Sequence, residues 1–290
     1  MFFSSLINFI FLLVFGWGDI QSVSNLETNL ISLKPSARPL EVTTDKSAVL
    51  AADGRFFLQA RRADEIQSIA SITKLMTALV FLDHNPGWDK VYEITAADNI
   101  AGGRLNLFLG ERVTIRDLFY TSLVASDNGA TIALVHATGL SDQEFVAKMN
   151  DEARRLGLVK TRFSDPIGLS DQNVSTAREV AYLAQAAFNR PEIQKAASSR
   201  EYQFTTELGV TKKVESTDYL LFDPGTNSFE VVGGKTGFTD RAGYCFVGRF
   251  KNDDGREVIS VVLNSQGKNE RFRESKALIN WVFDSYNWIR

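Results

Sequence analysis

The pattern of apolar and polar residues predicts β-strands near both ends of the chain. Two apolar runs, 48–52 and 55–60, flank Asp53-Gly54, a dipeptide typical of the type I′ turn that joins hairpin strands. Short runs rich in β-branched and aromatic residues return in the last third. These later runs are 202–205, 229–232, 244–250 and 258–263. The chain is therefore expected to open with a hairpin and to form further strands near its end.

Between these strands the apolar residues follow a helical period. One predicted helix, from about Ser71 to His84, is apolar on nearly every side and stops at Asn85-Pro86-Gly87. A helix of this kind is buried, so the polar residues at its start, Ser71 and Lys74, are expected inside the protein. The other predicted helices are 114–124, 130–136, one that begins at the Ser141–Glu144 capping box, one from the Thr176–Glu179 capping box to about Phe188, and 271–286.

Strands at both ends with helices between them indicate an α+β fold. We expect one antiparallel sheet flanked by helices, with an inserted all-helical region at about 85–200. The catalytic domain would span 45–290 and follow a polar linker at 25–44. An active site would lie in the cleft between the sheet and the helical region.

The N-terminus resembles an export signal. Leu6–Phe15 is apolar except for Asn8, and it is too short for a comfortable transmembrane helix. Ser22-Val23-Ser24 supplies the small residues of a cleavage site, so residues 1–24 are predicted to be a signal peptide. Export implies that the protein lies in the periplasm or on the outer face of the cytoplasmic membrane. No Lys or Arg precedes the apolar run, so an uncleaved membrane anchor and a buried N-terminal helix stay open as alternatives.

The composition narrows the function mainly by exclusion. The 290 residues are 44% hydrophobic and 23% charged, as in ordinary globular proteins, and the net charge of −3 gives no case for nucleic-acid binding. Cys245 is the only cysteine, so no intrachain disulfide can form. His84 and His136 sit beside apolar neighbours in predicted helices and are interpreted as structural. We therefore expect no metal site and no organic cofactor.

Three short motifs occur in order along the chain. They are S-x-x-K at Ser71-Ile72-Thr73-Lys74, S-D-N at Ser126-Asp127-Asn128 and K-T-G at Lys235-Thr236-Gly237. S-x-x-K alone is a weak signal, because Ser265-Gln266-Gly267-Lys268 also matches it, and Ser285-Tyr286-Asn287 matches S-x-N. The ordered set in its context, a buried helix start, a helix break and a strand, is specific to penicillin-binding proteins and class A β-lactamases.

These residue types suit nucleophilic catalysis. Lys74 lies one helical turn from Ser71, so its amine can reach the hydroxyl. The amine acts as a base only when neutral, and burial or a second cation such as Lys235 would lower its pKa. Ser126 could pass a proton to the leaving amine, and Asn128 could orient Lys74 and hold a substrate amide. Lys235 and Thr236 could bind a terminal carboxylate.

Longer stretches around the motifs resemble the D-alanyl-D-alanine carboxypeptidase family of low-molecular-mass penicillin-binding proteins. The similar stretches are 69–78, 165–169 with 173–177, and 234–244, within a resemblance that spans roughly residues 45–285. The resemblance implies a β-lactamase/transpeptidase-like fold and an acyl-enzyme on Ser71. It also implies an oxyanion hole from the amides of Ser71 and Phe238, and a carboxylate pocket formed by Lys235, Thr236, Gly237 and Thr239 with help from Arg271. Many relatives carry His where this chain has Phe238, but the implied role belongs to the backbone amide.

The family resemblance also implies partners and alternatives. Peptidoglycan stem peptides would be the substrates and β-lactam antibiotics would be covalent inhibitors. Many family members carry a C-terminal β-rich domain and an amphipathic membrane helix. This chain is expected to lack both and so to resemble the single-module branch, which includes D,D-endopeptidases that cut cross-links. A class A β-lactamase would need an E-x-x-L-N motif, and none lies between Asn128 and Lys235. A non-catalytic penicillin-binding or sensor module is the alternative from another class.

Overall fold

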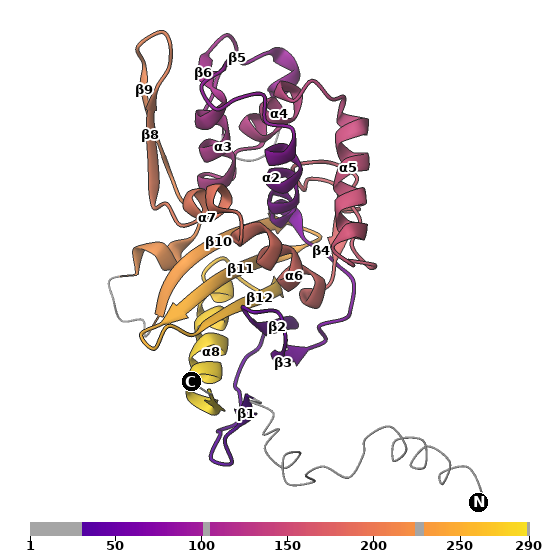
Figure 1. Ribbon diagram of the computed structural model, residues 1–290, viewed down its shortest axis with the longest axis vertical. Coiled ribbons are helices and arrows are strands. Elements are labelled where there is room, and N and C mark those ends of the chain that lie inside the picture. The colour runs from indigo at the N-terminus through magenta and orange to yellow at the C-terminus, as the bar shows by residue number, and fades with distance from the viewer. Residues whose placement is uncertain (1–30, 101–104, 224–228, 289–290) are drawn as a thin grey trace, which may run out of the picture. The chain divides into compact units, whose positions relative to one another are not determined.

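The computed structural model describes residues 31–100, 105–223 and 229–288 (Figure 1). The chain divides into two units, one formed by residues 1–38 with 285–290 and the other by 39–284. In the first, β1 (Ser32–Leu33) pairs antiparallel with β13 (Tyr286–Asn287). The predicted signal peptide, residues 1–24, lies outside the described residues. Among the described residues, no helix combines the length and the hydropathy needed to cross a bilayer.

A five-stranded antiparallel sheet forms the base of the larger unit. Its strand order is β10-β11-β12-β2-β3, so the predicted opening hairpin lies beside strands from the far end of the chain (Figure 1). The strands are β2 (Lys46–Ala51), β3 (Phe57–Arg61), β10 (Phe229–Thr239), β11 (Gly243–Asn252) and β12 (Glu257–Ser265). Every residue of β2 is buried, because β2 is an inner strand with both faces covered. The predicted α+β fold is confirmed.

The two faces of this sheet pack against different helices. Val247 and Val261 belong to the main core, on the side of α6 (Ala177–Phe188). Phe246 points the other way and packs on Phe272 of α8 (Glu270–Ser285), with 5.0 Å between the ring centroids. Because successive side chains of β11 point to opposite faces of the sheet, this strand contributes apolar side chains to the layer on each face.

The helical region surrounds one central helix. That helix is α2 (Lys74–Asp83), buried along nearly its whole length as its apolar pattern predicted. The helices around it are α3 (Ile115–Val124), α4 (Asn128–Ala137), α5 (Asp142–Arg155) and α7 (Pro191–Ala197). Ser141 and Glu144 cap α5 reciprocally, whereas Glu179 of the second predicted box turns instead to Lys160 and Thr161.

Two local predictions are wrong. The turn between β2 and β3 is not type I′, because that turn needs a positive φ at both central residues, and Gly54 has one (82°) but Asp53 does not. The hydrogen bond nearest the turn between the two strands runs from Ala51 N to Phe56 O, so the loop is longer than two residues. The strand predicted at 202–205 does not join the main sheet. It is β8 (Glu201–Thr205), which pairs with β9 (Thr211–Glu215) in a separate hairpin, where each strand buries only one residue.

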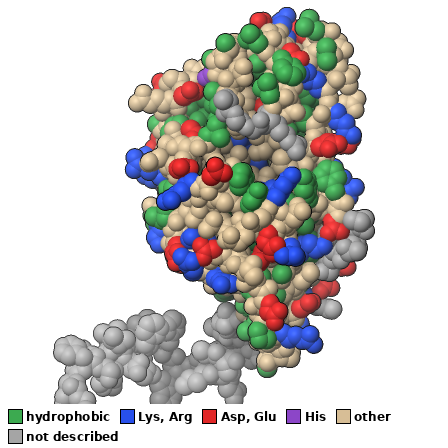
Figure 2. All heavy atoms as spheres, turned by 180° about the vertical axis from the view of Figure 1, so that it is seen from behind, with side chains coloured by type: hydrophobic (Ala, Val, Ile, Leu, Met, Phe, Trp, Pro, Cys, Tyr) green, Lys and Arg blue, Asp and Glu red, His purple; other side chains and the backbone are tan. Residues whose placement is uncertain are grey.

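Short elements complete the larger unit. The two-stranded pairs are β4 (Gln67–Ser68) with β7 (Val174–Ser175) and β5 (Val91–Glu93) with β6 (Arg112–Thr114), and the 3₁₀ helices are η2 (Ala70–Thr73), η3 (Ala96–Asp98) and η4 (Tyr219–Phe222). On the face that Figure 2 shows, basic and acidic side chains are intermingled, in keeping with the small net charge.

Candidate active site

Ser71 lies on η2, at the point where the chain enters α2. The helix predicted from Ser71 therefore begins with one 3₁₀ turn, and Ala70 immediately before the serine has a positive φ of 48°. Such a backbone conformation is unfavourable for alanine and persists only where the surroundings impose it. Here it turns Ser71 out of the core, so the serine is part-exposed beside the fully buried Lys74.

Lys74 makes three hydrogen bonds with its amine. Nζ lies 3.1 Å from Ser71 Oγ, 2.7 Å from Asn128 Oδ1 and 2.9 Å from the carbonyl oxygen of Ile167. Asn128 therefore lies where its side-chain oxygen can fix the position of the lysine amine. Ser71 Oγ also lies 3.4 Å from the Ile167 carbonyl, so the hydroxyl is positioned from two sides.

Burial lowers the pKa of Lys74 from 10.5 to about 7, while the carboxylates of Asp127 and Asp165 act in the opposite direction. The sequence suggested Lys235 as a second cation that lowers this pKa, but burial is the cause that lowers it. The pKa of Lys235 itself is lowered well below its usual value by burial and by the charges of Lys74 and Arg271. Near neutral pH a large fraction of the Lys74 amine is therefore neutral and able to accept a proton.

The second motif occupies the break between α3 and α4. Ser126 has a positive φ of 59°, and its Oγ accepts a hydrogen bond of 2.7 Å from Lys235 Nζ. Asp127 caps α4 by accepting from Ala130 N, and its second oxygen accepts from the backbone and side chain of Asn106. The aspartate thus fixes the turn that aims its two neighbours into the site.

The third motif lies within β10. Thr236 Oγ1 is 2.7 Å from Thr217 Oγ1, so two hydroxyls stand together on this wall. Gly237 lies so close to the serine that an added Cβ would be 2.6 Å from the Ile69 carbonyl oxygen and 3.3 Å from Ser71 N. Only glycine allows this approach, which brings the strand backbone beside the amide of Ser71.

The remaining predicted site residues differ in their surroundings. Arg271, which as a residue at a predicted helix start could also have been an ordinary surface arginine, is only 4% exposed. Its Nη1 donates to the carbonyl oxygens of Gly237 and Cys245. Phe238 is 48% exposed and stacks on Tyr244. Thr239 Oγ1 accepts from Ala242 N in the turn that follows β10, so its hydroxyl is engaged in that turn.

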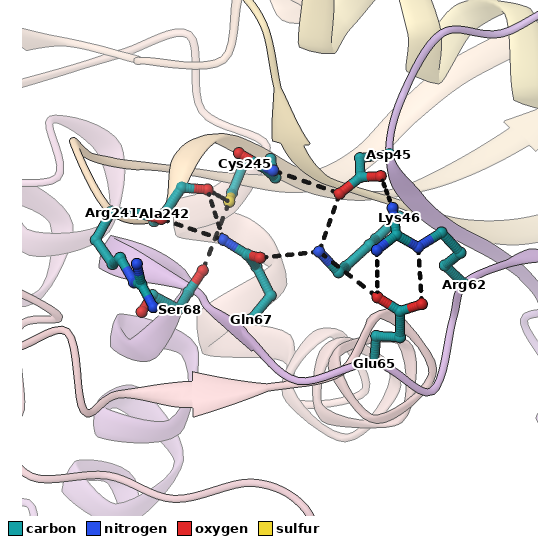
Figure 3. A network of polar contacts seen from close by, with 10 residues as sticks. Asp45, Lys46, Arg62, Glu65, Gln67, Ser68, Arg241, Ala242 and Cys245 are labelled. Carbon is teal, nitrogen blue, oxygen red and sulfur yellow. Dashed lines mark hydrogen bonds and ion pairs between the residues drawn. The ribbon is translucent and has the colours of Figure 1, made fainter.

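A network of hydrogen bonds and ion pairs contacts the turn that follows β10 (Figure 3). The buried Lys46 of β2 contacts Asp45 at 3.0 Å and Gln67 of β4 at 3.1 Å. Gln67 in turn donates to the carbonyl oxygens of Arg241 and Ala242, each at 3.2 Å. The network therefore ties the turn after the third motif to the segment that leads into Ser71.

The three motifs meet at a cleft with a volume of about 330 Å³. Its lining residues are Ser71, Ala125, Ser126, Asn128, Leu169, Thr217, Tyr219, Thr236, Gly237, Phe238, Lys268 and Arg271. Lys74 and Lys235 lie directly behind this surface. Ala125, Leu169, Thr217, Tyr219 and Lys268 were not predicted as site residues, and Lys268 ends the second S-x-x-K match of the sequence.

The backbone of the 165–169 segment is a functional part that the motifs did not reveal. Asp165 accepts from the amides of Ile167, Gly168 and Ser170, which folds the segment tightly and points the Ile167 carbonyl at Lys74. The available signal was the Asp-Pro-x-Gly pattern, which is typical of turns but gives no direction for a carbonyl.

Gly168→Ala is expected to destabilise the protein by about 3 kcal/mol and to slow acylation of Ser71, because it combines overpacking with backbone strain. Gly168 has a φ of 86°, and an added Cβ would overlap the carbonyl oxygen of Ala70. Thermal unfolding and the rate of labelling by a fluorescent penicillin measure the two effects.

Gly139→Ala is the matched control, since Gly139 has a φ of 79° but no atom within 4 Å of an added Cβ. The Gly139→Ala protein should be destabilised only by the cost of placing alanine at a positive φ. Its Ser71 should react with the fluorescent penicillin at the wild-type rate. Equal losses in both variants would contradict the role of close packing at Gly168.

Comparison with known proteins gives one family. Residues 34–267 match the model of the D-alanyl-D-alanine carboxypeptidase family. A D-alanyl-D-alanine endopeptidase of Haemophilus influenzae is 34% identical over 226 residues, which cover 76% of this chain and 75% of that protein. The carboxypeptidase DacF of Bacillus subtilis is 30% identical over 249 residues, 83% of this chain and 62% of that protein. The cefotaxime-bound structure of penicillin-binding protein D2 from Listeria monocytogenes superposes with a TM-score of 0.73 at 32% identity, covering 85% of this chain and 99% of that one.

Proposed function

This chain belongs to the D-alanyl-D-alanine carboxypeptidase family and is a serine-type peptidase, and we propose that Ser71 is the residue that its substrate acylates. The observation that carries the proposal is the contact of 3.1 Å between Ser71 Oγ and a buried amine whose pKa is about 7. The substrate class is the stem peptide of peptidoglycan, and the bond cut is the one between two D-alanines. Peptidoglycan lies outside the cytoplasmic membrane, so this activity needs the export that the N-terminal sequence predicts.

Acylation uses the neutral form of Lys74. Ser71 Oγ attacks the carbonyl carbon of the penultimate D-alanine while its proton passes to Lys74 Nζ. The amides of Ser71 and Phe238 stabilise the oxyanion that forms. When the C–N bond breaks, Ser126 Oγ gives a proton to the leaving amine and regains one from Lys235, 2.7 Å away. The acyl group is then an ester on Ser71.

Deacylation reverses these proton transfers. A water oxygen bonds to the ester carbonyl, the C–Oγ bond breaks, and Lys74 returns its proton to Ser71. The proton that the water loses restores the Ser126–Lys235 pair. Among the described residues, no carboxylate lines the cleft. The described part of the cleft thus lacks the deacylating Glu that a class A β-lactamase needs, which supports a β-lactam-inhibited peptidase over a class A β-lactamase.

The terminal carboxylate of the substrate has a matching wall. Thr236 and Thr217 present two hydroxyls 2.7 Å apart, and the buried Lys235 and Arg271 place positive charge behind them. A carboxylate accepts such hydrogen bonds and is attracted by both cations. This arrangement favours peptides that end at the residue after the scissile bond or carry a free carboxylate there.

Cleavage of cross-links is the second candidate. Similarity to a protein named as an endopeptidase favours it, and it uses the same acyl-enzyme with a larger leaving group. Carboxypeptidase and endopeptidase activity thus differ only in what occupies the leaving side of the cleft.

One incubation tests the proposed function. The purified protein is mixed with pentapeptide monomers or with cross-linked dimers, and the products are identified by mass. Release of D-alanine from monomers supports carboxypeptidase activity, and dimer cleavage supports the endopeptidase. If neither substrate is cut, and no fluorescent penicillin becomes attached to Ser71, the proposed function is wrong.

A further inference from the structure

Aromatic rings and cations form a row beside the cleft, and Phe238, Arg271, Tyr219 and Lys268 of this row line it. Phe238 stacks on Tyr244 at 4.3 Å, and Arg271 Cζ lies 5.6 Å from the Tyr244 ring and 4.8 Å from the Phe272 ring. Tyr219 stacks on the other end of this row, 5.5 Å from Phe272. The row therefore runs continuously from the third motif to η4.

Lys268 stands at the end of this row. Its Nζ lies 4.8 Å from the ring centroid of Tyr219, in the range of a cation–π contact, and it lines the cleft. The side chain is exposed, and it forms no ion pair with any residue in the described ranges. Unlike Arg271, whose Nη1 already donates to two carbonyl oxygens, Lys268 keeps an ammonium group available to a ligand.

The position of Tyr219 relates Lys268 to the substrate. Tyr219 follows Thr217 by two residues, and Thr217 contacts Thr236 at the wall assigned to the substrate carboxylate. The Tyr219–Lys268 pair therefore adjoins the leaving side of the scissile bond. The only charged residues that line the cleft in the described part of the chain are Lys268 and Arg271, so this side attracts anions.

We propose that Tyr219 and Lys268 form a subsite for an extended leaving group, a peptide that carries a further carboxylate beyond the one held at Thr236. The second stem of a cross-linked peptidoglycan dimer has this chemistry, whereas the single D-alanine released from a monomer does not reach the subsite. The exposed ring of Tyr219, 41% accessible, offers an apolar surface to the peptide, and Lys268 pairs with the carboxylate. The inference rests on the proposed function, and it identifies the cross-linked dimer as the substrate that uses this subsite.

The test compares two substrates in matched variants. In Lys268→Met, kcat/KM for a cross-linked dimer should fall about fivefold, mainly through KM, as expected for the loss of one exposed ion pair. Trimming of the pentapeptide monomer should change less than twofold. Lys268→Arg should restore dimer cleavage because it keeps the charge. Lys195→Met removes an exposed lysine from α7, outside the cleft, and should leave both rates unchanged.

Salt gives a second readout. Raising the ionic strength should weaken dimer cleavage by the wild type but affect Lys268→Met less, because exposed charge pairs are screened. Equal losses on both substrates, or no loss on either, would overturn the subsite. A wild-type protein that takes up penicillin at Ser71 and trims monomers, yet does not cut dimers, would overturn this inference alone. Failure to take up penicillin would instead reject the proposed function.

Discussion

Ser71→Ala is expected to abolish both peptide cleavage and covalent penicillin binding. The substitution removes the atom that forms the acyl ester, and loss of the nucleophile costs about 10⁶-fold in another serine hydrolase. The fold should survive, because Ser71 is part-exposed and its Oγ makes only one weak contact beyond Lys74, at 3.4 Å. Intact-protein mass spectrometry after incubation with a penicillin reports the adduct, and thermal unfolding reports the fold.

Thr73→Ser provides a control in the same 3₁₀ turn, since it keeps the hydroxyl that accepts from Asn173 Nδ2. It should retain the adduct on Ser71. A Ser71→Ala protein that still gains the mass of the penicillin would show that another residue is acylated, and the mechanism derived from Lys74 would then be wrong.

Lys74→Arg is expected to reduce the acylation rate by about 10²- to 10⁴-fold, the usual contribution of general base catalysis. Arginine keeps the positive charge but does not lose its proton at any accessible pH. If Lys74 contributed only charge, the variant would stay active. Stopped-flow or gel-based labelling with a fluorescent penicillin measures the rate directly, without the deacylation step.

The pH dependence follows from the lowered pKa of Lys74. Below pH 7 the amine carries a proton and cannot accept another, so acylation by the wild type should rise as the pH increases through about 7 and then level off. The residual rate of Lys74→Arg should lack this step. A wild-type rate that is flat between pH 5.5 and 8.5, or one that falls over that range, contradicts the assignment of Lys74 as the base.

Local patterns in the sequence predicted much of this architecture. The apolar circumference of 74–83 correctly indicated a buried helix, and the two capping boxes located the starts of α5 and α6. The three motifs indicated which residues gather at the cleft, since each chemistry needs a particular residue type at a particular spacing. These features depend on neighbours close in sequence, which is why a single chain reveals them.

Other features depend on contacts between distant segments. In the sequence, most of the catalytic domain lies between Ser71 and Lys268. Lys268 follows β12 and precedes α8, and the antiparallel pairing of β12 with β2 brings it to the cleft. The burial of Arg271 and the direction of the Ile167 carbonyl likewise arise from packing. The strand at 202–205 looks like the other strands in the sequence, and nothing local excludes it from the main sheet or predicts its partner β9.

The gathering of Lys74, Lys235 and Arg271 in the interior has an energetic consequence for the resting protein. Lys235 and Arg271 share one fully buried acid, Asp218, and one of its oxygens has no hydrogen-bond partner within the described residues. The charges of Lys235 and Arg271 are kept out of water and repel one another, so the unliganded cleft is less stable than the well-packed parts of the molecule. A negatively charged occupant relieves that repulsion, and heat resistance is thereby coupled to occupancy.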